Sequence, residues 1–348
     1  MLSTLKNRRF LKLTTYNVEL WNRMFNIEHD DNNPNFHNRK VKSYIHDGKT
    51  VYNYGLNKDK LAELHEIFSS RDDNLPHILG TQESISATNG TDRWRIIGDM
   101  ERVASAKAQD ATFQTTAALN SDGITHASLT NEIYITNDIK FISSREKVIS
   151  HSRTKHVKRV LCIATLLVYD EFTITVGSVH TTGGRFDDML ALNDLDFALE
   201  KEYENEQILI EDLDIFMGDF NLKKYNPEVV EETEKYMKGC ITEAEKKGPL
   251  VGLDRFNDWM WMNYPNSKNC IYDKILHAGY IDATEIGNIT HTSYFGGQVD
   301  YIFVKKNKFI PRSAQVYGEY TIFNREHKII NLSDHLPEEV VLEIIDNI

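Results

Sequence analysis

Six short segments of the sequence carry polar side chains that are suited to phosphate or divalent-metal chemistry. Five are apolar runs of strand length that end on a polar residue, and the sixth lies near the C-terminus. A single strand that ends in Asp is weak evidence for a catalytic site, because Asp is a common turn residue. Together, however, the segments supply three Asp, one Glu, two His and two Asn, namely Asp219, Asp300, Asp334, Glu83, His180, His335, Asn17 and Asn221. Such a set is typical of strands that deliver their ends to one hard-metal site for phosphodiester hydrolysis.

The oxygen-bearing members of the set suit Mg²⁺, which prefers oxygen ligands, takes few of them from the protein and keeps several waters. Glu83 and Asp334, with Asn17 nearby, supply a minimal set of this kind. The sequence therefore predicts a Mg²⁺ (or Mn²⁺) cofactor.

Asp219 and Asn221 lie two residues apart in Gly218-Asp219-Phe220-Asn221. With a strand period of two, both side chains are predicted to face one side, and Gly218 permits a close approach of the backbone. An acid in this position can orient or deprotonate the attacking water, and an amide can donate to a phosphate oxygen.

Asp300 lies within an apolar strand, and a buried carboxylate needs a partner. His335 is a natural one, because a carboxylate fixes the tautomer of an imidazole and raises its basicity. His180 ends another apolar strand, and a Thr-Thr-Gly-Gly run follows it where the backbone is free to approach an anion. Arg185 comes next and is predicted either to reach a substrate phosphate or to form a salt bridge at a helix start.

Each of these residues also has a plain structural interpretation. A lone His180 is more often a satisfied structural histidine, a lone Asp219 caps a turn, and a Ser-Asp pair such as the one at Asp334 caps a helix. Taken together, those interpretations require several independent coincidences, so the sequence favours one catalytic site.

The composition of the chain limits the classes of protein to which it can belong. The chain has 348 residues, of which 41% are hydrophobic, so it can bury a sizeable core. No apolar run approaches the roughly 18 residues of a membrane span, and the N-terminal residues lack the pattern of a signal peptide. Three widely spaced cysteines, Cys162, Cys240 and Cys270, argue against a disulfide framework or a zinc site. We therefore expect an intracellular protein, with a monomer as the default state.

The net charge of −12 limits the kind of binding partner that we expect. A protein that holds long duplex nucleic acid by its backbone is usually basic over the contact face. This chain offers only short basic stretches, at 153–159 and at 305–308. We expect a nucleic-acid partner with a short or end-type footprint.

Periodicity predicts an α/β protein. Apolar runs predict strands at 10–17, 77–82, 131–136, 159–169, 172–180, 213–218, 298–304 and 340–345. Amphipathic spacing predicts helices at 57–70, 185–201, 227–238 and 267–276. No linker, repeat or low-complexity tract divides the chain, so we expect one domain over 1–348, with an insert around 26–56 at the rim of the site.

The sequence resembles the endonuclease/exonuclease/phosphatase superfamily, whose fold is that of pancreatic-type deoxyribonuclease. The matching segments occur in the family's order and include Tyr16-Asn17, Gln82-Glu83, Val179-His180, Gly218-Asp219-Phe220-Asn221, Val299-Asp300-Tyr301 and Ser333-Asp334-His335. The resemblance implies a four-layer α/β sandwich of two packed mixed β-sheets flanked by helices. It also implies a divalent metal held chiefly by Glu83, with Asn17 and Asp334 in or near its shell.

The implied reaction is in-line attack of water on phosphorus, in which His180, Asn221 and His335 stabilise charge on the phosphoryl oxygens. Members of the superfamily differ in whether the Asp219 position or the His335–Asp300 pair acts as the base. We keep both assignments of the base and favour Asp219 as the residue that orients the water.

The substrate is less well defined. The segment Phe216-Met217-Gly218-Asp219-Phe220-Asn221-Leu222 lacks the Trp-x-Gly-Asp-x-Asn-Tyr-Arg form typical of inositol phosphatases. We therefore expect a nuclease or a nucleic-acid end-processing phosphodiesterase. A phosphatase or phosphodiesterase on a lipid or inositol phosphate is the alternative, and an inactive binding module is a minor one.

Overall fold

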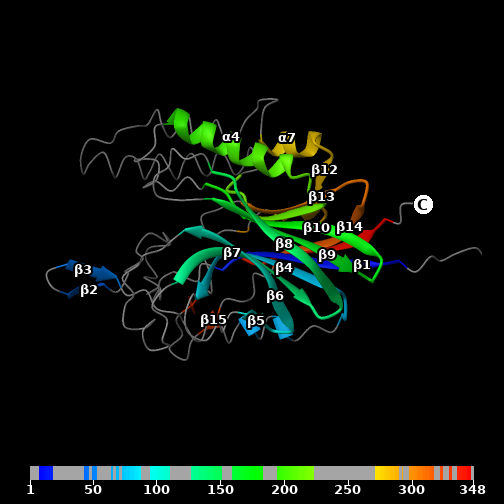
Figure 1. Ribbon diagram of the computed structural model, residues 1–348, viewed down its shortest axis with the longest axis horizontal. Helices are drawn as coiled ribbons and strands as arrows, with labels where there is room; N and C mark the ends of the chain where they lie inside the picture. The colour runs from blue at the N-terminus through cyan, green and yellow to red at the C-terminus, as the bar shows by residue number, and fades with distance from the viewer. Residues whose placement is uncertain are drawn as a thin grey trace, which may run out of the picture.

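Strands from both halves of the chain form two mixed sheets that pack face to face (Figure 1). This computed structural model describes residues 8–18, 43–46, 49–52, 64–65, 68–69, 73–87, 95–109, 127–150, 159–182, 194–222, 271–289, 292, 298–316, 322–323, 329–330 and 335–345. Within these ranges, the larger sheet has seven strands in the order β14-β17-β1-β4-β7-β6-β5, and the smaller has six in the order β12-β13-β11-β10-β9-β8.

The strands of the larger sheet are β1 (Phe10–Asn17), β4 (His77–Ala87), β5 (Ile96–Ile97), β6 (Met100–Gln109), β7 (Ala127–Thr136), β14 (Phe309–Val316) and β17 (Glu338–Ile344). Those of the smaller sheet are β8 (Ile139–Val148), β9 (Val160–Val168), β10 (Phe172–His180), β11 (Ile215–Asp219), β12 (Tyr280–Asp282) and β13 (Asp300–Lys305). Two short hairpins pair β2 (Ser43–His46) with β3 (Lys49–Tyr52) and β15 (Ile322–Phe323) with β16 (Ile329–Ile330).

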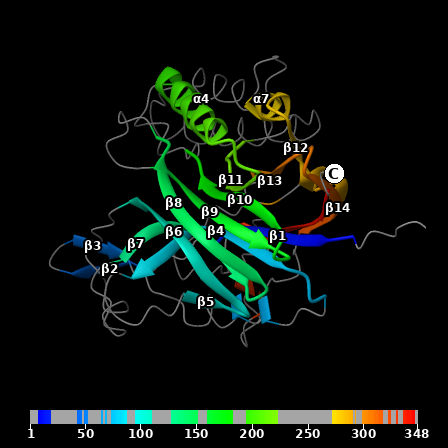
Figure 2. The same ribbon diagram turned by 45° about the vertical axis from the view of Figure 1, so that its right-hand side comes forward.

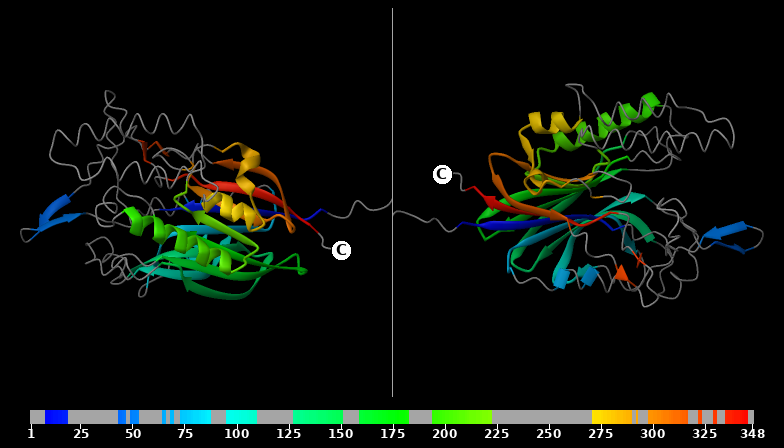
Figure 3. Two further views of the ribbon diagram at one scale, coloured as in Figure 1. Left: turned by 90° about the horizontal axis from the view of Figure 1, so that it is seen from above. Right: turned by 180° about the vertical axis from the view of Figure 1, so that it is seen from behind.

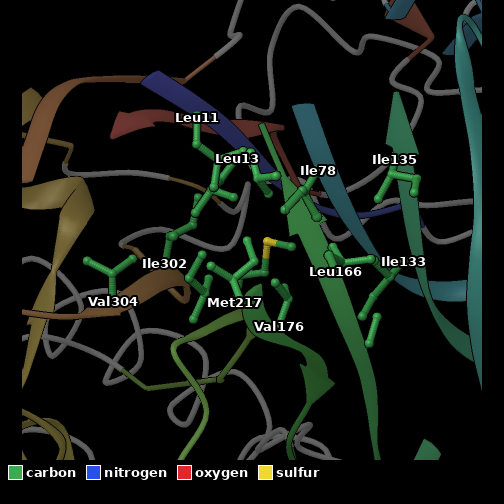
Figure 4. Packing of buried hydrophobic residues seen from close by; sticks show 14 of the residues in the cluster. Leu11, Leu13, Ile78, Ile133, Ile135, Leu166, Val176, Met217, Ile302 and Val304 are labelled. Carbon is green, nitrogen blue, oxygen red and sulfur yellow. The ribbon is translucent and has the colours of Figure 1, made fainter. Parts of the chain in front are cut away.

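The inner faces of the two sheets share one apolar core (Figure 4). Leu13 and Ile78 enter it from the larger sheet, and Val176, Met217 and Ile302 enter it from the smaller one; all five are fully buried. Burying each such side chain contributes about 1.5–3 kcal/mol relative to leaving it exposed. The core therefore holds the sheets together below the end at which the predicted site residues emerge.

Helices cover the outer face of the smaller sheet. Helix α4 (Asp194–Ile210) and helix α7 (Ile271–His277) lie over the smaller sheet (Figures 2 and 3), and a short 3-10 helix (Ala283–Gly287) follows β12. On the outer face of the larger sheet, Phe68 is buried with its ring 6.2 Å from that of His77. The predicted α/β sandwich of two packed mixed sheets is therefore confirmed. None of the helices within the described ranges is long and apolar enough to cross a membrane.

All eight predicted strands are present, with ends shifted by a few residues. The longer strands β6, β8 and β14 are not predicted, and neither are the short strands β2, β3, β5, β12, β15 and β16. The buried residues of β6 include the small Ala104 and Ala106, and most residues of β8 and β14 are exposed or half-buried. Seven consecutive residues of β8, from Lys140 to Glu146, are exposed, so this edge strand shows no apolar alternation and is held by its pairing with β9.

Two of the predicted helices have ends that differ from the prediction. Of the helix predicted at 185–201, residues 185–193 lie outside the described residues and the rest is observed in α4, which continues past 201 because Glu204 and Asn205 are buried by tertiary contacts. The helix predicted at 267–276 begins at Ile271 and ends at His277. Of the helix predicted at 57–70, residues 64–65 and 68–69 are helical and the rest lie outside the described residues, as does the whole segment 227–238.

One buried carboxyl group opposes the fold at neutral pH. Glu338 is fully buried, and its Oε1 atom accepts a hydrogen bond from Gln298 Nε2 (3.2 Å), whereas its Oε2 atom has no hydrogen-bond partner among the described residues. Burial, followed by the charges of Asp282 and Asp300, raises the pKa of Glu338 well above its usual value. A group whose pKa is higher in the folded protein favours folding below its unfolded pKa, and this contribution is lost as the pH rises through the folded pKa.

We therefore expect Glu338→Gln, which resembles the protonated acid, to raise the free energy of unfolding at pH 7 by about 1–3 kcal/mol. The gain should shrink as the pH falls toward the unfolded pKa of about 4.3. Urea unfolding at a series of pH values measures it. Glu339→Gln is the matched control, because Glu339 is the next residue of β17, is also buried and, like Glu338, accepts a hydrogen bond from a glutamine, Gln315 (3.1 Å). Its replacement should give no gain. A Glu338→Gln variant that is less stable than the wild type at pH 7 would contradict the prediction.

Candidate active site

Two pairs of parallel strands bring the predicted site residues to one end of the sandwich. β1 runs parallel to β4 in the larger sheet, and β10 runs parallel to β11 in the smaller one. Parallel neighbours end at the same edge, so β1 ends at Asn17 beside the part of β4 that leads into Glu83, and β10 ends at His180 directly opposite Asp219. The polar residues therefore meet because apolar strands of matched direction carry them there.

The antiparallel strands deliver their first residues to the same end. β13 begins at Asp300, which pairs with Asp219 at the end of β11. β17 begins at Glu338, opposite Thr15 of β1, so His335 just before it lies at this edge as well. Strand direction thus explains how residues far apart in the sequence converge.

Asp219 lies at the centre of the group and is 2% exposed. Its Oδ2 atom accepts a hydrogen bond from Asn17 Nδ2 (3.1 Å). The same atom lies 3.4 Å from His180 Nε2 and 3.6 Å from His335 Nε2. One carboxylate oxygen therefore faces three side chains from three different strands or loops.

His335 is held from its far side by Asp300. The distance from Nδ1 to Asp300 Oδ2 is 2.8 Å, and because a carboxylate can only accept, Nδ1 carries the donated proton. This bond directs Nε2 toward Asp219. Burial raises the pKa of the fully buried Asp300 above its usual value, and the neighbouring His335 opposes that shift. The contact matches the pairing predicted from the sequence.

Glu83 stands at the partly open side of the group, with 14% of its side chain exposed. Its Oε1 atom lies 3.5 Å from Asn17 Nδ2 and 3.7 Å from His180 Nδ1. A break in the pairing of β4 with β7 between Thr81 and Ser84 places Glu83 in a bulge, with φ at 53°. Left-handed backbone at a non-glycine residue costs energy and is concentrated at functional sites, and bulges re-aim side chains there.

Asn221 is placed by a turn, which corrects the prediction from strand period. β11 ends at Asp219, and Asn221 follows with φ at 46°. Its backbone N–H donates to Asp219 Oδ1 (2.9 Å), and its Nδ2 donates to the carbonyl of Thr181 (3.2 Å). Gly218 before it is necessary, because its φ is 150° and a Cβ atom there would lie 1.9 Å from the carbonyl oxygen of Val179.

The donor set fits a hard divalent cation. The carboxylates of Glu83 and Asp219 lie on either side of His180, and the amide of Asn17 lies between the same two groups. Carboxylate oxygens at a partly open edge are what Mg²⁺ uses, together with water, and the Nδ2 atom of Asn17 faces both carboxylates as a hydrogen-bond donor. Ligand atoms of Asp219, Asp300 and His335 also lie within 4.8 Å of one another. Within that trio, the Nδ1 atom of His335 is already engaged in the hydrogen bond to Asp300.

Two predicted site residues, Asp334 and Arg185, lie outside the described residues. The basic stretch at 305–308 is described, and it lies away from the site. β13 starts at Asp300 and ends at Lys305, five residues further on; at about 3.3 Å per residue this separation is about 17 Å. Lys305 and Lys308 pair there with Asp214 (3.7 and 2.6 Å), so they do not extend the site.

The sequence assigns no role to a polar layer that lies between the sheets below the site. Gln82 Nε2 donates to Ser178 Oγ (3.0 Å), Ser178 Oγ donates to the carbonyl of Thr81 (3.0 Å), and Thr15 Oγ1 donates to Gln82 Oε1 (3.4 Å). These bonds join three strands directly under Asn17 and Glu83. The polar, inward-facing positions at the ends of apolar strands are the signal from which the layer could be predicted.

A second unpredicted support lies beneath α4. The fully buried carboxylate of Glu204 accepts hydrogen bonds from the backbone N–H (2.8 Å) and the hydroxyl (2.5 Å) of Thr182. Thr182 comes two residues after His180, so the helix anchors the segment that leaves the site.

Comparison of the sequence with models of protein families and with curated proteins gives no match. Solved structures do match the fold. An endonuclease/exonuclease/phosphatase from Beutenbergia cavernae superposes with a TM-score of 0.53 and 12% identity, over 97% of this chain and 72% of that chain. The human Nocturnin catalytic domain, solved with a bound sulfate anion, superposes with a TM-score of 0.52 and 12% identity, over 97% of each chain. At this identity the likeness concerns architecture, and the chain has the endonuclease/exonuclease/phosphatase fold.

Proposed function

We propose that this protein is a divalent-metal-dependent phosphodiester hydrolase that acts on nucleic acid, as a nuclease or an end-processing phosphodiesterase. The observation that carries the proposal is the placement of Asp219. Its carboxylate lies within 3.6 Å of side chains from Asn17, His180 and His335 in a buried cluster of polar groups. The fold is shared with a protein whose structure contains sulfate, an anion with the tetrahedral shape of a phosphate.

In this proposal, Asp219 accepts a hydrogen bond from the attacking water and orients it toward phosphorus. His335, with carboxylates on both sides of its ring, donates from Nε2 to a phosphoryl oxygen. His180 and Asn221 donate to other oxygens of the same group. Donors that are in place before the reaction stabilise developing charge at little reorganisation cost, and this is usually the largest catalytic contribution.

Glu83 and Asn17, with Asp334, would hold the metal ion, for which Mg²⁺ or Mn²⁺ is the proposed identity. When bound, such an ion neutralises charge on the phosphoryl oxygens and polarises the phosphorus–oxygen bond. The protein's own part is to keep the carboxylate of Glu83 turned toward the site, which the bulge in β4 achieves.

The charged residues support a short nucleic-acid footprint. Away from the site, described Lys and Arg side chains such as Arg102, Lys147, Lys305 and Lys308 are paired with carboxylates. Each phosphate neutralised by a cation adds to the salt dependence of binding. Cations that are already paired with carboxylates are poor phosphate contacts. Most of the affinity for nucleic acid is therefore proposed to come from the site itself, with Arg185 at its edge.

We also propose one domain over 1–348, which is consistent with an apolar core drawn from both sheets. The β2–β3 hairpin belongs to the 26–56 insert and lies beyond the end of the sandwich at which β1 ends (Figures 1 and 3). An insert in this place would contact what lies beside the scissile phosphate.

The proposal predicts hydrolysis of bis(p-nitrophenyl) phosphate with Mg²⁺ or Mn²⁺, and a preference for oligonucleotides over other phosphoesters. The test is a panel of single-stranded DNA, duplex DNA, RNA, 5′-tyrosyl DNA, sphingomyelin and inositol phosphates. Binding of Asp219→Asn to single strands of increasing length should level off after a few nucleotides, with a shallow dependence on salt.

Each of the other possible outcomes would contradict a specific part of the proposal. Turnover of sphingomyelin or inositol phosphates alone would replace the nucleic-acid substrate by a lipid or sugar phosphate. Affinity that keeps rising over a full duplex turn would contradict the short footprint. No turnover of any phosphoester would refute the hydrolase and leave a binding module.

A further inference from the structure

Thr292 makes backbone contacts to both sides of the Asp300–His335 pair. It is fully buried. Its Oγ1 atom accepts hydrogen bonds from the backbone N–H groups of Val299 (3.0 Å) and Asp300 (3.1 Å). Its own carbonyl oxygen accepts a hydrogen bond from the N–H of Leu336 (2.7 Å), the residue that follows His335.

These three bonds fix the start of β13 and the segment before β17 against a common point. Asp300 is the first residue of its strand, so its N–H lies where the ladder of β13 begins, and the hydroxyl supplies the acceptor there. His335 lies outside any long strand, and the bond to Leu336 holds the backbone beside it. One residue therefore sets the distance between the two backbones that carry the pair.

We propose that Thr292 is a positioning residue for catalysis, which holds Asp300 and His335 at the separation that their hydrogen bond requires. The proposal rests on the proposed function, because it assigns Thr292 a role in the same site. A misplacement of about 1 Å in such a group can cost about a hundredfold in rate.

The side chain of Thr292 also acts on the carboxyl group itself. Burial is the main influence on Asp300 and raises its pKa, and the nearby Thr292 hydroxyl is among the groups that lower it. Within the part of the chain that the structure describes, the Oδ1 atom of Asp300 has no hydrogen bond of standard geometry. The two backbone bonds to Oγ1, which have standard geometry, therefore carry most of the positioning.

The test compares two replacements of Thr292. Thr292→Val keeps the shape and removes the acceptor, and Thr292→Ser keeps the acceptor. With bis(p-nitrophenyl) phosphate, Thr292→Val should lose at least about tenfold in kcat with little change in KM, whereas Thr292→Ser should stay within about threefold of the wild type. In a His335→Ala background, Thr292→Val should cause no further loss, because residues that act as a unit are not additive. An equal loss in both backgrounds would contradict positioning.

Thr14→Val is the matched control. Thr14 is also fully buried, and its hydroxyl is 2.8 Å from a ring nitrogen of His77, on the outer face of the larger sheet. This change should lower the melting temperature as much as Thr292→Val does, and it should leave kcat unchanged. If both variants lose kcat equally, the effect of Thr292 is general destabilisation and the proposal fails. If Thr292→Val does not fold, Thr292→Cys replaces it in the same assays, because a thiol is a weaker acceptor.

A readout without turnover separates this inference from the proposed function. The Nδ1–H of His335, bonded to Asp300, should give a low-field proton resonance, assigned by its loss in His335→Ala. That resonance should weaken or vanish in Thr292→Val and persist in Thr292→Ser and Thr14→Val, whether or not the wild type hydrolyses a phosphodiester. An unchanged resonance in Thr292→Val would overturn the role of Thr292 and leave the proposed function intact.

Discussion

Asp219→Asn should lower kcat by at least about a thousandfold, within the range of about 10² to 10⁴ that a positioned acid or base contributes. The Asn side chain has almost the same shape and keeps an acceptor for the backbone N–H of Asn221, which bonds to Oδ1 in the wild type (2.9 Å). It loses the charge that faces His180 and His335 and the second acceptor that orients water. Steady-state kinetics on bis(p-nitrophenyl) phosphate measure the loss, with KM expected to change little.

Asp214→Asn is the control for this change. Asp214 precedes the start of β11, at the end remote from the site, and is 5% exposed. Its carboxylate accepts hydrogen bonds from the N–H of Thr175 (2.9 Å) and from Lys308 (2.6 Å). Its replacement should reduce stability and spare kcat. If Asp219→Asn keeps more than about a tenth of the wild-type rate, an amide suffices and Asp219 is not the residue that orients water.

Glu83→Gln should lower turnover by at least about a hundredfold and weaken metal binding, because an amide is a poorer ligand than a carboxylate and adds no charge. EDTA in excess should abolish the activity of the wild type, and Mg²⁺ or Mn²⁺ should restore it. Isothermal titration of the ion measures the binding directly. The fold should survive, because the side chain is at the open edge of the site and not in the apolar core.

Glu343→Gln is the matched control, since 16% of the Glu343 side chain is exposed, close to the 14% of Glu83. Glu343 lies in the same sheet, at the end of β17 that pairs with Phe10, and it forms ion pairs with Arg8 and Arg312. Its replacement should leave metal binding and turnover unchanged. Full activity in EDTA, or in Glu83→Gln, would refute metal dependence through this residue.

Local sequence was sufficient for the residues on which these predictions rest. The runs that end at Asn17, His180 and Asp219 are strands in the structure, because apolar residues recur along them at strand spacing and most of their residues are buried within the sheets. An Asp within such a run needs a partner, and this predicted that Asp300 pairs with a histidine. The observed 2.8 Å contact with His335 follows from that requirement.

Local sequence was not sufficient where tertiary contacts, and not the spacing of apolar residues, determine the secondary structure. Strand β8 is mostly exposed, and it is a strand because β9 offers it hydrogen-bond partners. Helix α4 passes its predicted end because Glu204 is buried against Thr182. In both places the stabilising group comes from a residue that is distant in sequence. The local periodicity of the strand or helix therefore cannot predict it.

The sequence by itself determined which side chains are candidates for the site, because residue types and strand ends are local properties. Only the tertiary structure decided their arrangement: strand directions bring Asp219 within 3.6 Å of His335, a bulge turns Glu83 toward the site, and a left-handed turn places Asn221. Direction, register and bulge position depend on pairing between distant strands. Thr292 belongs to this second class, since a hydroxyl that holds two backbones can be recognised only after the backbones have met.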